Sequence, residues 1–370
     1  MDRDELGAWL RLLETPGVGR ETARRLLATF GSPQAVFEAS PACLRSLLSP
    51  ALAGALAQAP DHWENLLQET WDWLNARSDT PHELLVLGDR DYPQALLQTA
   101  DPPLLLYLNG RRELLGKTAL AVVGSRNPSP QGRENALAFS RHLSQSGFCV
   151  VSGLALGIDG AAHLGALDGV GATIAVVGTG LDIAYPKSHT ALAQRIARDG
   201  LLVSEYALGA PPLAQHFPQR NRLIAGLTAG TLVVEATLQS GSLITARLAA
   251  ECGREVFAIP GSIHAPQSRG CHLLIQQGAK LVTTAQDILD ELRPDQRPAA
   301  QAELAGPTAQ SEPAQDPLLS AMGYDPVTLD TLMARTGESA ASLSVRLLEL
   351  ELSAQVQRLP GQLFQRRVQS

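Results

Sequence analysis

The feature that most constrains this chain is a pattern repeated through its middle, from residue 117 to 291: a short apolar run, a turn that contains glycine, and a helix-like segment. We predict strands at 118–123, 148–152, 173–178, 201–204, 230–235, 255–259 and 280–283. Because the runs are almost wholly apolar and do not alternate with polar residues, the strands are expected to be buried on both faces. Buried strands that alternate with helices predict an α/β fold built on a doubly wound, mostly parallel sheet.

Ligands of such a sheet bind beyond the carboxyl ends of its strands, so the residues that follow each strand are the site candidates. The stretch Thr118–Arg126 is the strongest of them. Gly124 lets the backbone approach a ligand closely, and Ser125 and Arg126 precede a predicted helix at 131–146, a combination that favours an anion. The other candidates are Ser152-Gly153, Gly178-Thr-Gly180, Glu205, Glu235 and Pro260-Gly261. The anion belongs either to a nucleotide or to a nucleic-acid backbone.

The densest polar cluster is His216–Arg222. Its Arg220, Asn221 and Arg222 can grip successive phosphates and a base edge. Tyr185 and Phe217 offer faces on which bases can stack, as single-strand binders need, and Lys187 adds a charge. An alternative stays open, in which the two arginines pair with Glu205 and Glu235 and hold the strand ends together.

Three common kinds of site are disfavoured. A dinucleotide fingerprint is missing, because Val123–Pro128 does not read GxGxxG and the second strand ends without the acidic residue that binds ribose. Asp159 and His163 lie four residues apart, but two ligands do not make a metal site. Ser152 and Ser242 lack a recognisable His–acid pair, so we interpret them as hydroxyls that contact a turn or a phosphate. We therefore expect no catalytic residue, no metal and no cofactor.

The flanking regions look like separate modules. Residues 1–78 are expected to form a helical domain, in which Thr15–Leu27 resembles a helix–hairpin–helix whose Gly17–Gly19 turn can face a phosphate. The alternative is a hairpin that binds protein, which the acidic surroundings favour. Residues 79–291 are expected to form the sheet domain, entered through a bridge at 80–116 with a short strand and ordered loops.

The region rich in proline, alanine, glutamine and glutamate at 292–316 is expected to be a flexible linker. Residues 317–370 then predict a winged helix, with helices at 325–336 and 339–352 and a hairpin at 356–364. Whether this module binds DNA or protein stays open.

The distribution of charge indicates where an anionic partner docks. Residues 1–116 carry 10 basic and 16 acidic side chains, residues 117–290 carry 13 and 11, and residues 291–370 carry 7 and 10, which together give the net charge of −7. The middle region is the only one with a positive balance. The four cysteines show no CxxC spacing, and the sequence has no signal pattern and no run long enough to cross a bilayer, so we expect a cytoplasmic protein.

Several of these segments occur together and in order in a known family. The chain resembles the DNA-processing protein A (DprA/Smf) family over nearly all of residues 84–291. The matching motifs are Val123–Arg126, Ser152–His163, Gly180–Lys187, Phe217–Ala225, Gln239–Ala246, Gly253–Gly261 and Gly270–Gly278. Any one motif is weak evidence, but the set is highly specific. The helical module of the SAM or helix–hairpin–helix kind and the winged helix also resemble those of the family.

The resemblance implies an extended Rossmann-like core that binds single-stranded DNA during natural transformation, protects the incoming strand and helps to load RecA recombinase. It implies phosphate contacts for Arg126 and Lys187, with Asn221 and its neighbours Arg220 and Arg222 in the same pocket. It also implies backbone approach and hydroxyl contacts from Gly124, Ser125, Ser152, Gly153, Ser240, Gly241 and Ser242. The stretch with His272, Leu274 and Ile275 resembles the part of the family fold used for dimerisation and for an overlapping RecA contact, so a homodimer is expected.

We therefore predict a non-enzymatic recombination mediator that binds single-stranded DNA. The first rival is a nucleoside-monophosphate phosphoribohydrolase, which uses a similar Rossmann variant. Its Pro-Gly-Gly-x-Gly-Thr-x-x-Glu signature is missing, because the corresponding region reads Glu235-Ala-Thr-Leu-Gln-Ser-Gly-Ser242. The second rival is a scaffold for partner proteins, which predicts no affinity for nucleic acid.

Overall fold

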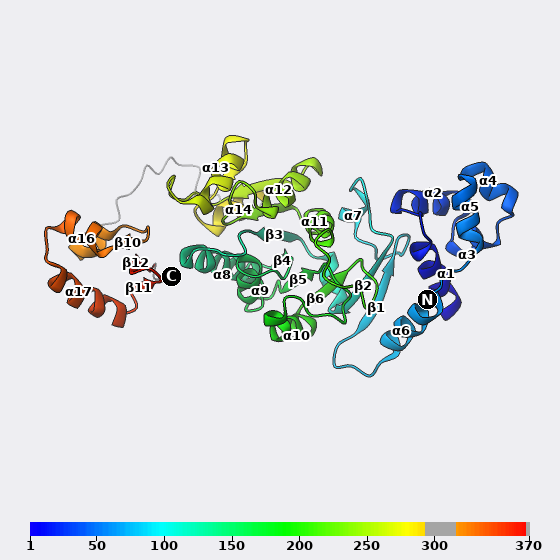
Figure 1. The fold of residues 1–370 in the computed structure, drawn as a ribbon, viewed down its shortest axis with the longest axis horizontal. Coiled ribbons are helices and arrows are strands. Elements are labelled where there is room, and N and C mark those ends of the chain that lie inside the picture. The colour runs from blue at the N-terminus through cyan, green and yellow to red at the C-terminus, as the bar shows by residue number, and fades with distance from the viewer. Residues whose placement is uncertain (293–315, 368–370) are drawn as a thin grey trace. The chain divides into compact units, whose positions relative to one another are not determined.

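The computed structural model describes residues 1–292 and 316–367. They belong to two compact units, which divide between Leu292 and Arg293 and are described separately below. Nearly all of the linker predicted at 292–316 lies outside the described residues. Figure 1 traces the chain from the N-terminal helices through the sheet to the C-terminal unit.

The first unit opens with short helices whose starts follow from their sequences. The helices are α1 (Arg3–Glu14), α2 (Arg20–Phe30), α3 (Pro33–Glu38), α4 (Pro41–Leu47), α5 (Pro50–Ala57) and α6 (Trp63–Asn75). A Ser-Pro pair begins each of α3, α4 and α5, and each serine hydroxyl accepts a backbone N–H of the first turn. Serine is a favoured N-cap, and proline fits the first helical position because it has no N–H to leave unpaired. We predicted a helical region here but not α4 and α5 individually, which are short.

A nine-stranded sheet forms the centre of this unit, in the order β1-β2-β6-β5-β4-β3-β7-β8-β9. Its strands are β1 (His82–Val86), β2 (Leu105–Gly110), β3 (Ala119–Val123), β4 (Cys149–Ser152), β5 (Thr173–Val176), β6 (Leu201–Ser204), β7 (Gly230–Val233), β8 (Glu255–Ala258) and β9 (Lys280–Leu281). The strands from β6 to β9 along this order pair in parallel. The predicted α/β, doubly wound, mostly parallel sheet is confirmed.

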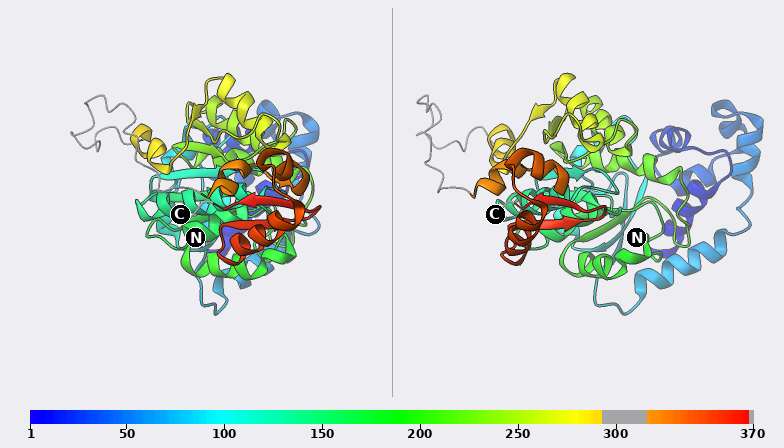
Figure 2. Two further views of the ribbon diagram at one scale, coloured as in Figure 1. Left: turned by 90° about the vertical axis from the view of Figure 1, so that its left-hand side faces the viewer. Right: turned by 60° about the vertical axis from the view of Figure 1, so that its left-hand side comes forward.

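Helices cover both faces of the sheet, which is why its strands are apolar throughout (Figures 1 and 2). In β3, Ala119, Ala121 and Val123 face the core that includes α7 (Gln94–Leu97), α11 (His216–Gly226), α12 (Gly241–Glu251) and α13 (Arg269–Gln276). Leu120 and Val122 face the core with α8 (Pro130–Gln145), α9 (Ile158–Ala166) and α14 (Ala285–Leu292). Along the same sheet, α10 (Thr190–Asp199) packs on β5 and β6.

The bridge at 80–116 contains more regular structure than we predicted. We expected one short strand, but β1 and β2 form an antiparallel pair, and β2 also pairs with β6. Leu105 and Tyr107 pack with the N-terminal helices, while Leu106 and Leu108 pack in the sheet core. The helical region and the sheet therefore share a core through β2, and the boundary at residues 78 and 79 stays a prediction.

The second unit is a winged helix, as predicted. It consists of α15 (Pro317–Met322), β10 (Val327–Thr328), α16 (Leu329–Thr336), α17 (Ala340–Leu352), β11 (Val356–Leu359) and β12 (Leu363–Arg366), with the sheet order β10-β12-β11. Leu318, Leu332, Leu343 and Leu347 are almost fully buried in its core. The predicted helix at 325–336 begins later, at Leu329, because Val327 and Thr328 pair with β12. Among all the described residues, no helix combines the length and the apolar character needed to cross a membrane.

Candidate nucleic-acid interface

A cleft of about 760 Å³ opens at the carboxyl ends of β3 and β7. These neighbouring strands are the point at which the order of the parallel sheet reverses, the usual ligand position in a doubly wound sheet. The structure brings many of the predicted site residues together in its lining: Gly124, Ser125, Arg126, Phe217, Arg220, Asn221, Ser240, Gly241 and Ser242. Ser152, Gly153, Lys187 and Arg222 are not among the residues that line it.

The turn after β3 has no room for a side chain at Gly124. A Cβ there would lie 2.7 Å from Cγ1 of Ile158 and 2.9 Å from the carbonyl oxygen of Glu235. The Ser125 amide donates to that carbonyl at 2.8 Å, and the Glu235 carboxylate accepts from the Ser129 amide at 2.9 Å. These contacts tie the turn to the end of β7 and leave the exposed Arg126 side chain at the cleft.

Arg220 lies at the floor of the cleft and is 4% exposed. Its Nη1 donates to the carbonyl oxygens of Gly153 and Val176. A Cβ on Gly153 would lie 2.1 Å from the guanidinium, so only glycine fits. Ser152, also buried, donates its hydroxyl to the Val122 carbonyl at 2.7 Å. From the sequence we predicted that Ser152, Gly153 and Arg220 contact a ligand. In the structure, the Ser152 hydroxyl and the Arg220 guanidinium donate to backbone carbonyls of the protein.

Asp159 lies beside Arg220 and holds the loop that follows β4. Its carboxylate accepts the amides of Gly153 at 3.1 Å and Ala155 at 3.3 Å. Burial raises the pKa of Asp159, while Arg220 and the two amides oppose that rise. Burial lowers the pKa of Arg220 to about 10, and the charge of Asp159 opposes the fall. The two charges thus compensate each other in the floor of the cleft.

His163 supports the same loop from beneath as a neutral imidazole. The Thr173 hydroxyl donates to the Val150 carbonyl, so Nδ1–H of His163 donates to the Thr173 oxygen at 2.7 Å. Nε2 accepts the Leu154 amide at 3.2 Å and has no place for a proton. Burial, together with the charges of Arg220 and His189, lowers the pKa of His163 to about 3.

We expect this histidine to make the fold sensitive to acid. The pKa of His163 is about 3 in the folded chain and about 6.5 in the unfolded chain. Between pH 6.5 and pH 3 the unfolded chain therefore binds a proton at this histidine that the folded chain does not bind. The free energy of unfolding therefore falls as the pH decreases through this range. The slope reaches about 1.4 kcal/mol per pH unit. Urea unfolding of wild type and His163→Gln should show a stability difference that shrinks between about pH 7 and pH 4.5. Asp159, which is common to both chains, contributes equally to each. A difference that stays constant over this range would contradict the assignment.

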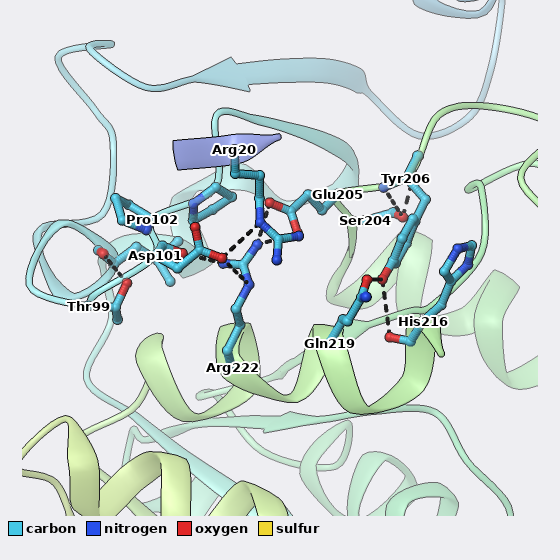
Figure 3. A network of polar contacts seen from close by, with 12 residues as sticks. Arg20, Thr99, Asp101, Pro102, Ser204, Glu205, Tyr206, His216, Gln219 and Arg222 are labelled. Atoms are coloured by element: carbon cyan, nitrogen blue, oxygen red, sulfur yellow. Dashed lines mark hydrogen bonds and ion pairs between the residues drawn. The ribbon is translucent and has the colours of Figure 1, made fainter. Parts of the chain in front are cut away.

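Arg222 does not line the cleft, and its side chain lies in an ion-pair network with Arg20, Asp101 and Glu205 (Figure 3). It pairs with Glu205 and, through Nε at 3.2 Å, with Asp101. Arg20 and Arg24 of α2 reach the same Asp101, and Arg20 also lies 3.4 Å from Glu205. Burial by itself raises the pKa of Asp101, but the three arginines outweigh it and the pKa lies below its usual value. The alternative of a structural arginine is therefore confirmed for Arg222 with Glu205, whereas Arg220 does not pair with Glu235.

The wall of the cleft carries aromatic rings beside a cation. Tyr185 and Phe217 have ring centroids 5.4 Å apart, and the Arg126 guanidinium lies 5.6 Å from the Phe217 centroid. Asn221 accepts from Nε of Arg220 at 3.0 Å and donates to the Gly241 carbonyl at 3.4 Å. An exposed base can stack on such rings while a guanidinium holds the adjacent phosphate.

The N-terminus of α12 forms the opposite side of the cleft. Ser240 caps this helix, and its hydroxyl lies 2.5 Å from that of Ser242. The Ser242 amide donates to the Ser240 hydroxyl at 3.4 Å, and the positive end of this eleven-residue helix favours an anion at this position. Sequence reasoning missed Thr237, Thr245 and Gln267, which also line the cleft. Thr245 lies inside the motif Gln239–Ala246 and could have been found from its helical spacing to Ser242, which places both side chains on one face of α12.

Among the described residues, Arg126 and Lys187 have no carboxylate partner within 4 Å, and both are exposed. Lys187 begins the short helical turn Lys187–His189, two residues after Tyr185. An unpaired cation at a surface is available to an anionic ligand, whereas Arg20, Arg24 and Arg222 are neutralised within the protein.

The predicted interface residues lie elsewhere, on α13. His272 hydrogen-bonds the Gly261 carbonyl through Nε2 at 3.0 Å, Leu274 is 9% exposed, and Ile275 packs against the sheet core. Beside them, an apolar hollow of about 620 Å³ lies between α12 and α13. The structure contains one chain, so the role of these residues as an interface stays a prediction.

Comparisons with known proteins give one family for all three regions of the chain that match a family model. Family models described as DNA recombination-mediator protein A, DprA winged helix domain and DprA-like N-terminal HHH domain match residues 83–293, 297–362 and 3–51. The chain is 43% identical to Protein Smf of Escherichia coli over 76% of each chain. It is 52% identical to DNA processing protein DprA of Streptococcus pneumoniae over 55% of this chain and 72% of that one.

Two solved structures of DNA processing protein A are also similar in fold. The X-ray structure of DNA processing protein A from Streptococcus pneumoniae superposes with a TM-score of 0.67 and 39% identity, over 79% of this chain and 98% of that chain. DNA processing protein A from Helicobacter pylori, whose structure was described for its single-stranded DNA binding mode, superposes with a TM-score of 0.52 and 32% identity, over 58% and 97%.

Proposed function

This chain belongs to the family of DNA recombination-mediator protein A, named DprA or Smf in its relatives, and from that membership we propose that it binds single-stranded DNA in the cleft between β3 and β7. The observation that carries the proposal is the convergence of Arg126, the rings of Tyr185 and Phe217, and the N-terminus of α12 on one cleft. Phosphates would lie against Arg126, Lys187 and the helix terminus, and a base would stack on the rings.

The cleft suits a single strand better than a duplex. Stacking on Phe217 requires an unpaired base, because the faces of a base inside a duplex are covered by its neighbours. Every base has such a face, so the binding should tolerate any sequence. The H. pylori relative, described for its single-stranded DNA binding mode, supports the same ligand class.

Within natural transformation, we propose that the protein protects the incoming strand and loads RecA onto it as a homodimer joined through His272, Leu274 and Ile275. Two clefts on one strand would act as linked sites, which offsets the small number of cations in each. The four unpaired cysteines fit a reducing compartment, so we place this activity in the cytoplasm.

The rival reading as a phosphoribohydrolase is less well supported. The carboxylates nearest the cleft already have partners, since Asp159 is compensated by Arg220 and Glu235 accepts from Ser129. A catalytic carboxylate has to reach the substrate rather than the protein's own amides. Release of free base from a nucleoside monophosphate would revive this reading, and absence of any DNA affinity would favour the protein scaffold.

Direct binding tests the proposal. We expect the full chain to bind a fluorescent oligo-dT more tightly than a duplex of equal length, measured by anisotropy. Because each neutralised phosphate contributes about −0.7 to the salt slope of single-strand binding, two cations predict an affinity about sevenfold lower at 200 mM than at 50 mM salt. Equal affinity at the two salt concentrations, or a preference for the duplex, would contradict the proposed site.

A further inference from the structure

The outer face of α17 carries a row of exposed apolar side chains. Val345, Leu348 and Leu352 are 59%, 56% and 80% exposed, and Ala341 continues the row at its N-terminal end. Their spacing of four, three and four residues places them on one stripe of the helix. The opposite face, with Leu343, Leu347 and Leu350, is already buried in the core of the winged helix. The exposed row therefore makes no contribution to that core.

This helix is poorly suited to the use that its position suggests. In helix–turn–helix proteins that read DNA, the second helix enters the major groove, and here α17 is the second helix. Its one basic side chain, Arg346, is held by ion pairs with Asp316 and Glu338. Glu349 and Glu351 flank the row, and negative charge opposes contact with phosphates. The surface favours a protein partner.

We propose that this row is a contact between two copies of the chain, formed by α17 packing antiparallel against α17 of a second copy. The spacing four-three-four reads the same in both directions, so an antiparallel pair matches Ala341 with Leu352 and Val345 with Leu348. A contact related by a two-fold axis requires such self-complementarity, because each copy presents the same residues.

The charges beside the row also suit this arrangement. In an antiparallel helix pair, the flanking positions seven residues apart lie opposite each other. Glu349 would thus face Ser342 of the second copy, and Glu351 would face Ser344. No glutamate would face a glutamate of the second copy. Glu349 and Glu351 would each lie near the positive N-terminus of the opposite helix. A parallel pair would instead set Ser344 opposite Glu349, so only the antiparallel pair places Ser344 opposite Glu351.

One helix pair buries less area than a standard stable interface, so the association should be weak in isolation. It is separate from the contact proposed at α13, and two such contacts per chain would let molecules associate beyond a dimer. The inference does not depend on DNA binding, because it concerns the chain without nucleic acid.

Sedimentation velocity of the full chain without DNA, over a wide range of concentration, tests the proposal. Wild type should associate as its concentration rises. Leu348→Arg, an exposed substitution, should weaken the association at least about a hundredfold, because two leucines are lost from each contact. Circular dichroism should show the same helical content. Association that Leu348→Arg leaves unchanged would overturn the proposal.

Placing a positive or a negative charge at Ser344 tests the orientation of the helices. Ser344→Lys should strengthen the association about fivefold, because it faces Glu351 twice in each pair, and Ser344→Glu should weaken it by a similar factor. Adding Glu351→Lys to Ser344→Glu should restore it. Equal behaviour of Ser344→Lys and Ser344→Glu would exclude the antiparallel pair. Particle size that is independent of concentration, or duplex binding that Leu348→Arg abolishes, would also overturn the proposal, in favour of another occupant.

Discussion

Replacing Arg126 and Lys187 together by alanine should reduce affinity for oligo-dT about a hundredfold. Each substitution removes a cation that has no carboxylate partner within the described residues, so its full charge is available to a phosphate. We expect about tenfold from each single variant, adding in free energy because the two side chains belong to different loops. The salt slope should also become shallower by about 0.7 for each removed contact. Fluorescence anisotropy at several salt concentrations measures both quantities.

Two further variants make this result specific. Arg141→Ala removes the same charge from α8, where the arginine pairs with Asp168, and should leave the affinity unchanged. Phe217→Leu should weaken binding about tenfold through lost stacking while it leaves the salt slope unchanged. If the Arg126 and Lys187 variants bind like wild type, the site lies outside the cleft, in the N-terminal helices or the winged helix.

Replacing Arg220 by methionine should destabilise the first unit by about 3–5 kcal/mol, the largest stability effect that we expect. The guanidinium is buried, and its removal leaves the Gly153 and Val176 carbonyls without their donor and Asp159 without its compensating charge. Urea unfolding of the full chain measures the change. Because Arg220 also builds the floor of the cleft, the folded variant should bind oligo-dT more weakly.

The matched control is Arg247→Met on α12. This arginine is exposed and pairs only with Glu251 within its own helix, so its loss should change stability by less than about 0.5 kcal/mol. Adding Asp159→Asn to Arg220→Met should recover part of the loss, since it removes the uncompensated charge. An Arg220→Met chain as stable as Arg247→Met would show that the buried pair does not hold the loop.

The roles of Arg126, Arg220 and Arg222 could not be distinguished from the sequence. Arg126, Arg220 and Arg222 each follow a strand or begin a helix, and all three read as phosphate contacts. In the structure, only Arg126 is exposed at the cleft, Arg220 supports its floor, and Arg222 joins Asp101, which lies far from it in the sequence. Nothing local distinguishes these roles, because the partner that neutralises an arginine is set by long-range packing.

The sequence by itself determined the doubly wound sheet, the winged helix and the end of the sheet at which the cleft lies. Apolar runs that do not alternate, glycines at the strand ends and helix caps are local signals, and they act wherever the chain folds. The tertiary structure alone decided that β2 pairs with β6 and that Asp159 and His163 hydrogen-bond the amides of the loop after β4. It also decided which cations stay available for a ligand. These outcomes depend on contacts between residues distant in the chain, whose burial and charge compensation no short pattern contains.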